Sequence, residues 1–216
     1  MTENISLEKQ ISSIWNSIKG FHIVHFIKTG SDLDLFNTII NSGEEGINSK
    51  ALAKNKNLNY SYIDKWCNSG IAWKILDIIQ NDRIILAPHM NAILTKKGDP
   101  RYLLPYIQAC INHFGPDMEN HASYYKNGKT YKFQEHSHSF SVNIGDITEG
   151  LQTLITSKII PNLDDINHIL NNGGTLLDFG CGTGNLLLKA SNIYKTAIFY
   201  GLDIDKNGLK TANKSI

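Results

Sequence analysis

Apolar residues recur at helical spacing along much of the chain before residue 171. Three stretches carry this spacing and predict amphipathic helices: residues 5–28, 32–40 and 146–171. Gly20 is expected to separate or bend the first stretch, and Pro161 is expected to divide the last. The pattern predicts a mainly helical N-terminal part.

Residues 48–86 follow an order of elements that is typical of a winged helix-turn-helix. A short helix at 49–57 precedes a longer one at 62–79, in which an interruption is expected near Gly70. The candidate capping residues of these two helices are Asn48 or Ser49, and Asn59 or Ser61. A hairpin follows at residues 78–86, because Asn81 and Asp82 favour a turn.

The pattern changes after an expected helix stop at residues 171–174. Apolar stretches typical of strands then alternate with helical ones, with strands at 175–179 and 196–202 and helices at 186–194 and from 206 onward. This alternation predicts a βαβ unit, the opening of a doubly wound, Rossmann-like sheet. The fold class is therefore α/β in the C-terminal part, preceded by a mainly α winged-helix domain.

A glycine-rich turn follows the first of these strands. Asp178 lies near the end of the strand, and the turn consists of Gly180, Cys181, Gly182, Thr183 and Gly184. Glycines let a ligand approach the backbone, and the next helix presents free amide N–H groups. We expect a ligand here, with the Asp178 carboxylate accepting a hydrogen bond from an ammonium group, directly or through water.

A second acidic residue, Asp203, ends the next predicted strand. A carboxylate in that position can accept hydrogen bonds from both hydroxyls of a ribose. Ile204 can pack on the face of an adenine ring, and Asp205 is placed to cap the following helix. Together with the glycine turn, these residues predict a site for a nucleoside-containing ligand.

The spacing of the glycines indicates which nucleoside fits. The dinucleotide fingerprint requires a third glycine where this chain has Asn185. Asp178 would repel a pyrophosphate and attract an ammonium group. S-adenosylmethionine (SAM) has no phosphate and carries an ammonium group, so we expect SAM as the cofactor.

Both motifs resemble those of a known family. LLDFGCGTGN resembles the first motif of the class I SAM-dependent methyltransferases, and GLDID resembles the second. The resemblance implies that Asp178 and the Gly180–Gly184 turn hold the methionine part, that Asp203 holds the ribose, and that Ile204 packs against the adenine. It implies methyl transfer from SAM to a small-molecule acceptor, and it identifies no catalytic residue in this chain.

The N-terminal part is similar in pattern to dimeric small-molecule O- and N-methyltransferases. ALAKNKNLNYSYIDKWCNSGIAWKIL resembles their winged-helix region, which serves dimerisation and covers the active site. We expect a homodimer with three domains: a helical and winged-helix domain at 1–98, a helical linker, pocket-covering and dimer segment at 99–171, and the start of the SAM-binding domain at 172–216.

Each singled-out residue also has a structural interpretation. The glycine turn can join a strand to a helix without any ligand, and Asp203 can serve as a helix cap. Cys181 can be read as a nucleophile, but we favour a small side chain packed in the turn.

Residues 100–145 are rich in aromatic and histidine side chains. Four histidines raise the question of a metal site: His113, His121, His136 and His138. The last two are closely spaced, but apart from Glu135 no cysteine or acidic cluster accompanies them. We expect no metal, and we interpret the segment as packing or as the lining of a substrate pocket.

Composition and charge exclude several other classes. The formal net charge of +1 gives no field that would attract nucleic acid or an anionic membrane. The three cysteines form no CxxC pair, no signal peptide is visible, and no apolar run approaches about 18 residues. We expect a cytoplasmic protein that binds neither nucleic acid nor membrane.

The predicted sheet is short for the family that it resembles. Residues 175–216 supply two strands, and each further strand–helix unit needs about 30 residues. We therefore expect a C-terminally truncated methyltransferase fragment that is inactive alone. The alternatives are a winged-helix regulatory protein that binds a nucleoside ligand without catalysis, and an NAD-linked oxidoreductase, which the glycine spacing disfavours.

Overall fold

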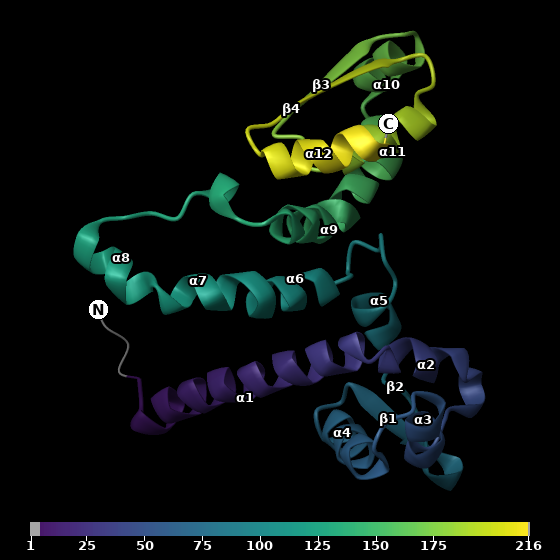
Figure 1. Cartoon of the computed structure of the whole chain (residues 1–216). Coiled ribbons are helices and arrows are strands. Elements are labelled where there is room, and N and C mark those ends of the chain that lie inside the picture. Colours follow the sequence, from purple (N-terminus) through teal and green to yellow (C-terminus); the bar gives the residue numbers. More distant parts are fainter. Residues whose placement is uncertain (1–4, 216) are drawn as a thin grey trace. The chain divides into compact units, whose positions relative to one another are not determined.

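The computed structural model describes residues 5–215 and divides the chain into two compact units, Met1–Thr95 and Lys96–Ile216 (Figure 1). Residues 1–4 and 216, which the first and last expected domains include, lie outside the described residues. None of the helices within 5–215 combines the length and apolar character needed to cross a lipid bilayer.

Unit 1 consists of helices and one antiparallel hairpin. Its elements are α1 (Leu7–Asp32), α2 (Leu35–Asn41), η1 (Gly43–Glu45), α3 (Ser49–Asn55), α4 (Tyr60–Ala72), β1 (Leu76–Ile79), η2 (Gln80–Asp82), β2 (Arg83–Leu86) and α5 (Met90–Leu94). The order α3, α4, β1, β2 is the short helix, longer helix and hairpin that the sequence predicted, but the longer helix ends at Ala72 instead of residue 79, because residues 76–79 pair with β2 as strand β1.

Capping residues begin the helices as expected, but two predicted breaks are wrong. Asn48 and Asn59 cap α3 and α4 by accepting hydrogen bonds from backbone N–H groups. Gly20 lies inside the continuous helix α1, because one glycine costs a helix only about 1 kcal/mol. Gly70 lies inside α4, where an added Cβ would come 2.6 Å from Leu76 Cδ1, so this glycine permits close packing.

The core of unit 1 contains the C-terminal half of α1. The rings of Phe26 and Trp66 stack with their centroids 4.6 Å apart, and Trp66 Nε1 donates a hydrogen bond to the Phe26 carbonyl oxygen at 3.2 Å. The part of α1 up to Phe21 leaves large apolar side chains exposed: Ile11, Ile14, Trp15, Ile18 and Phe21. Within the described part of unit 1, α1 therefore carries an apolar surface that is left uncovered.

The first part of unit 2 is helical. Its elements are α6 (Leu104–Ala109), η3 (Cys110–Phe114), α7 (Gly115–Glu119), α8 (His121–Asn127), η4 (Phe133–Glu135), α9 (His138–Leu154), η5 (Ile155–Ile159), η6 (Ile160–Asn162) and α10 (Asp164–Asn171). Ser137 caps α9 by accepting a hydrogen bond from the Phe140 N–H. The short turn η6 contains Pro161 and separates the long helical run from α10, as expected.

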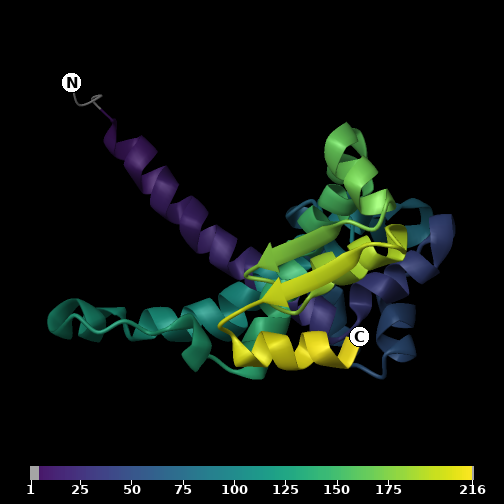
Figure 2. The same cartoon turned by 90° about the horizontal axis from the view of Figure 1, so that it is seen from above.

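A βαβ unit follows, formed by β3 (Thr175–Phe179), α11 (Asn185–Ile193) and β4 (Ile198–Leu202). The two strands pair in parallel, with Asp178 opposite Gly201, and lie side by side in Figure 2. One face of this sheet packs against a cluster of buried side chains, which are Ile160, Leu170 and Tyr194. The predicted parallel unit is present, and α12 (Lys206–Ser215) follows it.

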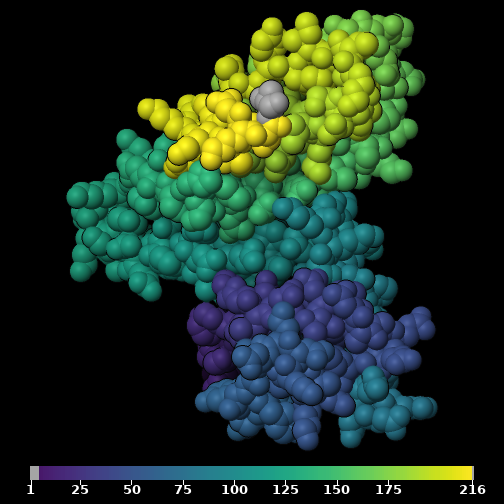
Figure 3. All heavy atoms as spheres, turned by 45° about the vertical axis from the view of Figure 1, so that its right-hand side comes forward, coloured from purple at the N-terminus to yellow at the C-terminus, as the bar shows by residue number. Residues whose placement is uncertain are grey.

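Helix α9 lies beside both α11 and α12. Glu149 of α9 pairs with Lys189 of α11 at 3.4 Å, and His138 Nε2 lies 2.9 Å from Thr211 Oγ1 of α12. Figure 3 shows the yellow atoms of α12 packed against the teal and green atoms of unit 2. The C-terminal half of α9 thus lies near α11, and its N-terminal end lies near α12.

Candidate functional site

The glycine turn connects β3 to α11 with a backbone that favours glycine. Gly180, Gly182 and Gly184 have φ angles of 94°, 51° and 76°, which side chains with a Cβ rarely adopt. The Gly180 and Cys181 N–H groups donate hydrogen bonds to the carbonyl oxygen of Leu202, at 2.7 and 3.1 Å. The turn is therefore fastened to the end of β4, where Asp203 begins the next segment.

Asp203 links the turn to the start of α12. Its Oδ2 accepts a hydrogen bond from the Gly182 N–H at 2.6 Å, and its Oδ1 accepts one from the Asp205 N–H at 2.7 Å. Each carboxylate oxygen can accept a further hydrogen bond. The residue can therefore bind ribose hydroxyls while it holds the turn.

Asp178 lines the same cavity as the glycine turn and Asp203, and its carboxylate is unengaged. The side chain is half-buried and makes no hydrogen bond or ion pair within residues 5–215. Burial, with a smaller contribution from Asp203, raises the pKa of the Asp178 carboxyl. A cation placed beside it would be attracted to the charged form and would offset that burial.

The remaining predicted residues occupy different environments. Cys181 is buried, and its sulfur would lie 2.8 Å from a Cβ added at Gly201, so it packs between the turn and β4. Burial and the nearby carboxylates raise the pKa of its thiol, which keeps it protonated. Thr183 is buried, whereas Ile204 is 76% exposed. Asp205 caps α12 by accepting hydrogen bonds from backbone N–H groups.

These residues line a cavity of about 290 Å³ within unit 2. Asp178, the turn and Asp203 form one wall, and Ile204 is not among the lining residues. Phe133 and one face of α9 form the other wall, with Ser141, Gly145, Thr148 and Gln152 facing the cavity. Sequence reasoning missed this α9 face. Its signal was a run of small and polar residues at spacings of four, three and four in a helical pattern.

The histidines of residues 100–145 serve local contacts. His136 Nε2 lies 2.8 Å from Asp117 Oδ2, and its ring stacks on Phe140. Burial acts to lower the pKa of His136, but the Asp117 hydrogen bond and charge raise it overall. His138 contacts Thr211, as described above. Within residues 5–215, none of these side chains belongs to a group of three potential metal ligands.

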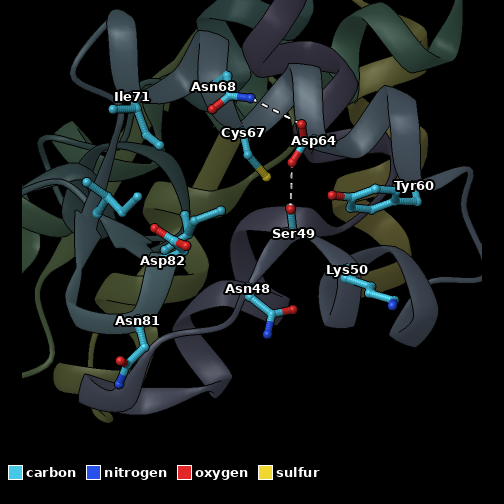
Figure 4. A pocket seen from close by; sticks show the side chains of 12 residues that line it. Asn48, Ser49, Lys50, Tyr60, Asp64, Cys67, Asn68, Ile71, Asn81 and Asp82 are labelled. Atoms are coloured by element: carbon cyan, nitrogen blue, oxygen red, sulfur yellow. Dashed lines mark hydrogen bonds between the residues drawn. The ribbon is translucent and has the colours of Figure 1, made fainter.

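A separate cavity of about 400 Å³ lies in unit 1 between α3, α4 and the hairpin (Figure 4). Asp64 faces it, but its oxygens already accept hydrogen bonds from Ser49 Oγ at 2.8 Å and Asn68 Nδ2 at 3.3 Å. Burial raises the pKa of the nearby Cys67 thiol to about 12. The Asp64 carboxylate is therefore already engaged, in contrast to Asp178 in unit 2.

No protein-family model matches the chain, and no curated protein matches it. Several solved structures match the chain. Human N-acetylserotonin methyltransferase in complex with SAM is 11% identical, with a TM-score of 0.68 over 99% of this chain and 64% of that structure. PigF with SAH is 14% identical, with a TM-score of 0.66 over 98% of this chain and 62% of that one.

The mitomycin 7-O-methyltransferase is 12% identical, with a TM-score of 0.67 over 95% of this chain and 61% of that structure. The chain has the fold of the matched part of these methyltransferases. At such identities the likeness concerns the fold, and the chain spans about three fifths of the length of these structures.

Proposed function

We propose that this protein is part of a SAM-dependent methyltransferase that acts on a small-molecule acceptor. The observation that carries the proposal is the unengaged carboxylate of Asp178, beside a glycine turn and in the same cavity as Asp203. A cavity with these carboxylates favours a ligand with positive charge. The shared fold with structures solved with SAM and SAH supports the same ligand.

The residues present fit SAM better than a phosphate-bearing nucleotide. Asp178 can accept a hydrogen bond from the ammonium group, and Asp203 keeps acceptor capacity for ribose hydroxyls. The glycine turn leaves room for the ligand against the backbone. Ile204, exposed beside Asp203, can pack against the adenine. When bound, SAM supplies the electrophilic methyl group, and the chain's residues orient the donor.

We propose that unit 1 serves dimerisation. The order α3, α4, β1, β2 supports a winged helix, and the near-neutral chain supports a role other than DNA binding. The exposed apolar half of α1 supports a homodimer. We keep the expected domains at 1–98, 99–171 and 172–216, and a cytoplasmic location, since Cys67, Cys110 and Cys181 are free thiols.

The proposal is tested by titrating SAM, S-adenosylhomocysteine and NADH into the protein in a calorimeter, with Asp203→Ala measured alongside. Saturable binding of the two adenosyl ligands that is lost in the variant is the expected result. Binding of NADH without binding of S-adenosylhomocysteine would revive the oxidoreductase alternative. If the folded protein binds none of the three ligands, the glycine turn is structural, and the function must be sought in the winged helix.

A further inference from the structure

The face of α9 that lines the cavity carries small and polar residues beside the apolar Ile144 and Leu151. Ser141, Gly145, Thr148 and Gln152 recur every three or four residues, so they lie on one side of the helix. Gly145 is buried, and a Cβ there would collide with the side chain of Thr183 in the glycine turn. The helix therefore approaches the turn closely at its middle, with a polar group on either side of that contact.

Gln152 lines the cavity and has one carboxamide atom without a hydrogen-bond partner. The Thr148 hydroxyl lies within hydrogen-bond distance of the helix carbonyls of Ile144 and Gly145, to which it can donate, and it accepts a hydrogen bond from Gln152 Nε2 at 3.0 Å. This contact fixes the carboxamide with Nε2 toward Thr148. The opposite atom, Oε1, is buried and has no donor within residues 5–215.

Ser141 presents a second unengaged group. The residue is 5% exposed, lines the cavity, and its hydroxyl makes no hydrogen bond within the described part of the chain. Eleven residues separate it from Gln152, which places the two groups roughly 16 Å apart along the helix axis. One small group cannot reach both, so only an elongated ligand could contact the two groups at once.

The neighbours of α9 indicate which end is which. The C-terminal half of α9, with Gln152, lies near α11, the helix that follows β3 and Asp178. The N-terminal end, with Ser141, lies near α12, the helix that follows β4 and Asp203. We therefore assign Gln152 to the Asp178 end of the cavity, where an ammonium group is expected. We assign Ser141 to the Asp203 end, where the ribose is expected.

We propose that α9 contacts both ends of the adenosyl amino acid. Gln152 Oε1 accepts a hydrogen bond from the ammonium group, and the Ser141 hydroxyl forms a hydrogen bond with the adenosyl end. The inference deepens the proposed function and rests on it. The two residues determine specificity for a ligand that carries both a nucleoside and a free amino group.

The test compares two ligands that differ at one end. S-adenosylhomocysteine has the nucleoside and the amino acid, whereas 5′-methylthioadenosine has the nucleoside and lacks the amino acid. Dissociation constants are measured by calorimetry for the wild-type protein, Gln152→Leu and Ser141→Ala. Ser157→Ala and Gln108→Leu, which remove the same groups away from the cavity, are the controls.

Gln152→Leu is expected to raise the dissociation constant of S-adenosylhomocysteine about tenfold or more, because a charge-assisted hydrogen bond is lost. The dissociation constant of 5′-methylthioadenosine should stay unchanged. Ser141→Ala is expected to weaken both ligands by a similar factor. Binding of 5′-methylthioadenosine by Gln152→Leu also shows that this variant folds.

If Gln152→Leu loses affinity for both ligands equally, the residue only supports the fold, and the inference is overturned. An effect of Ser141→Ala on S-adenosylhomocysteine alone would reverse the assigned ends and overturn it too. If Gln152→Leu leaves both ligands unchanged, the inference fails and the proposed function stands. If the wild-type protein binds neither ligand, both fail together.

Discussion

Asp203 joins two segments of backbone that meet at the cavity. One oxygen accepts from the Gly182 N–H and the other from the Asp205 N–H. These bonds restrict the backbone of the turn, which reduces the conformational entropy that is lost when a ligand binds. At the residue scale, the predicted ribose-binding carboxylate is thus also a structural one, which motif spacing alone did not indicate.

Asp203→Asn is expected to loosen this arrangement. The amide NH2 group replaces one acceptor oxygen and meets a backbone N–H, so one hydrogen bond is lost. We expect the free energy of unfolding to fall by about 1–3 kcal/mol and S-adenosylhomocysteine to bind about tenfold more weakly. Chemical denaturation and calorimetry measure the two effects. The exposed Asp165→Asn in α10 is the control, and an equal loss of stability there would contradict the argument.

Asp178 predicts a pH dependence of binding. Its raised pKa means that it takes up a proton at a higher pH than an ordinary Asp, whose pKa is about 3.9. The affinity for an ammonium-bearing ligand should therefore fall as the pH drops through this raised pKa. Asp178→Asn should bind weakly at every pH, without that inflection. Calorimetric titrations across acidic pH check this, and an unchanged inflection in the variant would assign it to another group.

The same shift has a cost in the ligand-free protein. Because the pKa is raised, the charged carboxylate is less stable in the folded state, and this penalty is present above the pKa of the unfolded chain. Asp178→Asn should therefore raise the melting temperature of the free protein at neutral pH while it weakens binding. This opposition between stability and binding is typical of a functional carboxylate.

At the scale of elements, local signals predicted much of the fold. Residues 175–179 form a strand with the predicted bounds, and the hairpin turns at Asn81 and Asp82. Both succeed because turn residues and apolar runs act locally. Gly70 was misread as an interruption, because its purpose is contact with Leu76, which lies on another element. The α9 face was missed for a similar reason, since polar residues at helical spacing are usually exposed to solvent.

Gly145 provides a test of the contact between α9 and the glycine turn. Gly145→Ala places a Cβ against Thr183, which must push the helix away from the turn. We expect a loss of about 1–3 kcal/mol in the free energy of unfolding, together with weaker binding of S-adenosylhomocysteine.

Gly20→Ala is the matched control, because Gly20 lies inside α1 with nothing within 4 Å of an added Cβ. It should stabilise the protein by about 0.5–1 kcal/mol. Stabilisation by both substitutions would show that α9 can move from the turn without cost, and would remove the basis for the second wall of the site.

At the scale of the whole molecule, the exposed apolar face of the first part of α1 needs an explanation. Phe26, Ile27 and Gly30 are buried, all in its C-terminal half, whereas Trp15 is 62% exposed and Ile14 is 64% exposed. A contiguous apolar face of this kind is rare on a monomer, and most helical stability comes from burying such a face. A second copy of the chain would supply the same apolar face through a two-fold axis.

This predicts that the protein sediments as a dimer and that Trp15→Glu shifts it toward the monomer. The introduced charge would have to be buried without a partner in the dimer, which costs far more than it does on an exposed helix. Asn16→Glu places the same charge next to it in sequence but on another side of α1. It should leave the dimer intact. Analytical ultracentrifugation over a range of protein concentrations decides the matter, since a wild-type monomer throughout, or equal dissociation in both variants, would exclude α1 as the dimer contact.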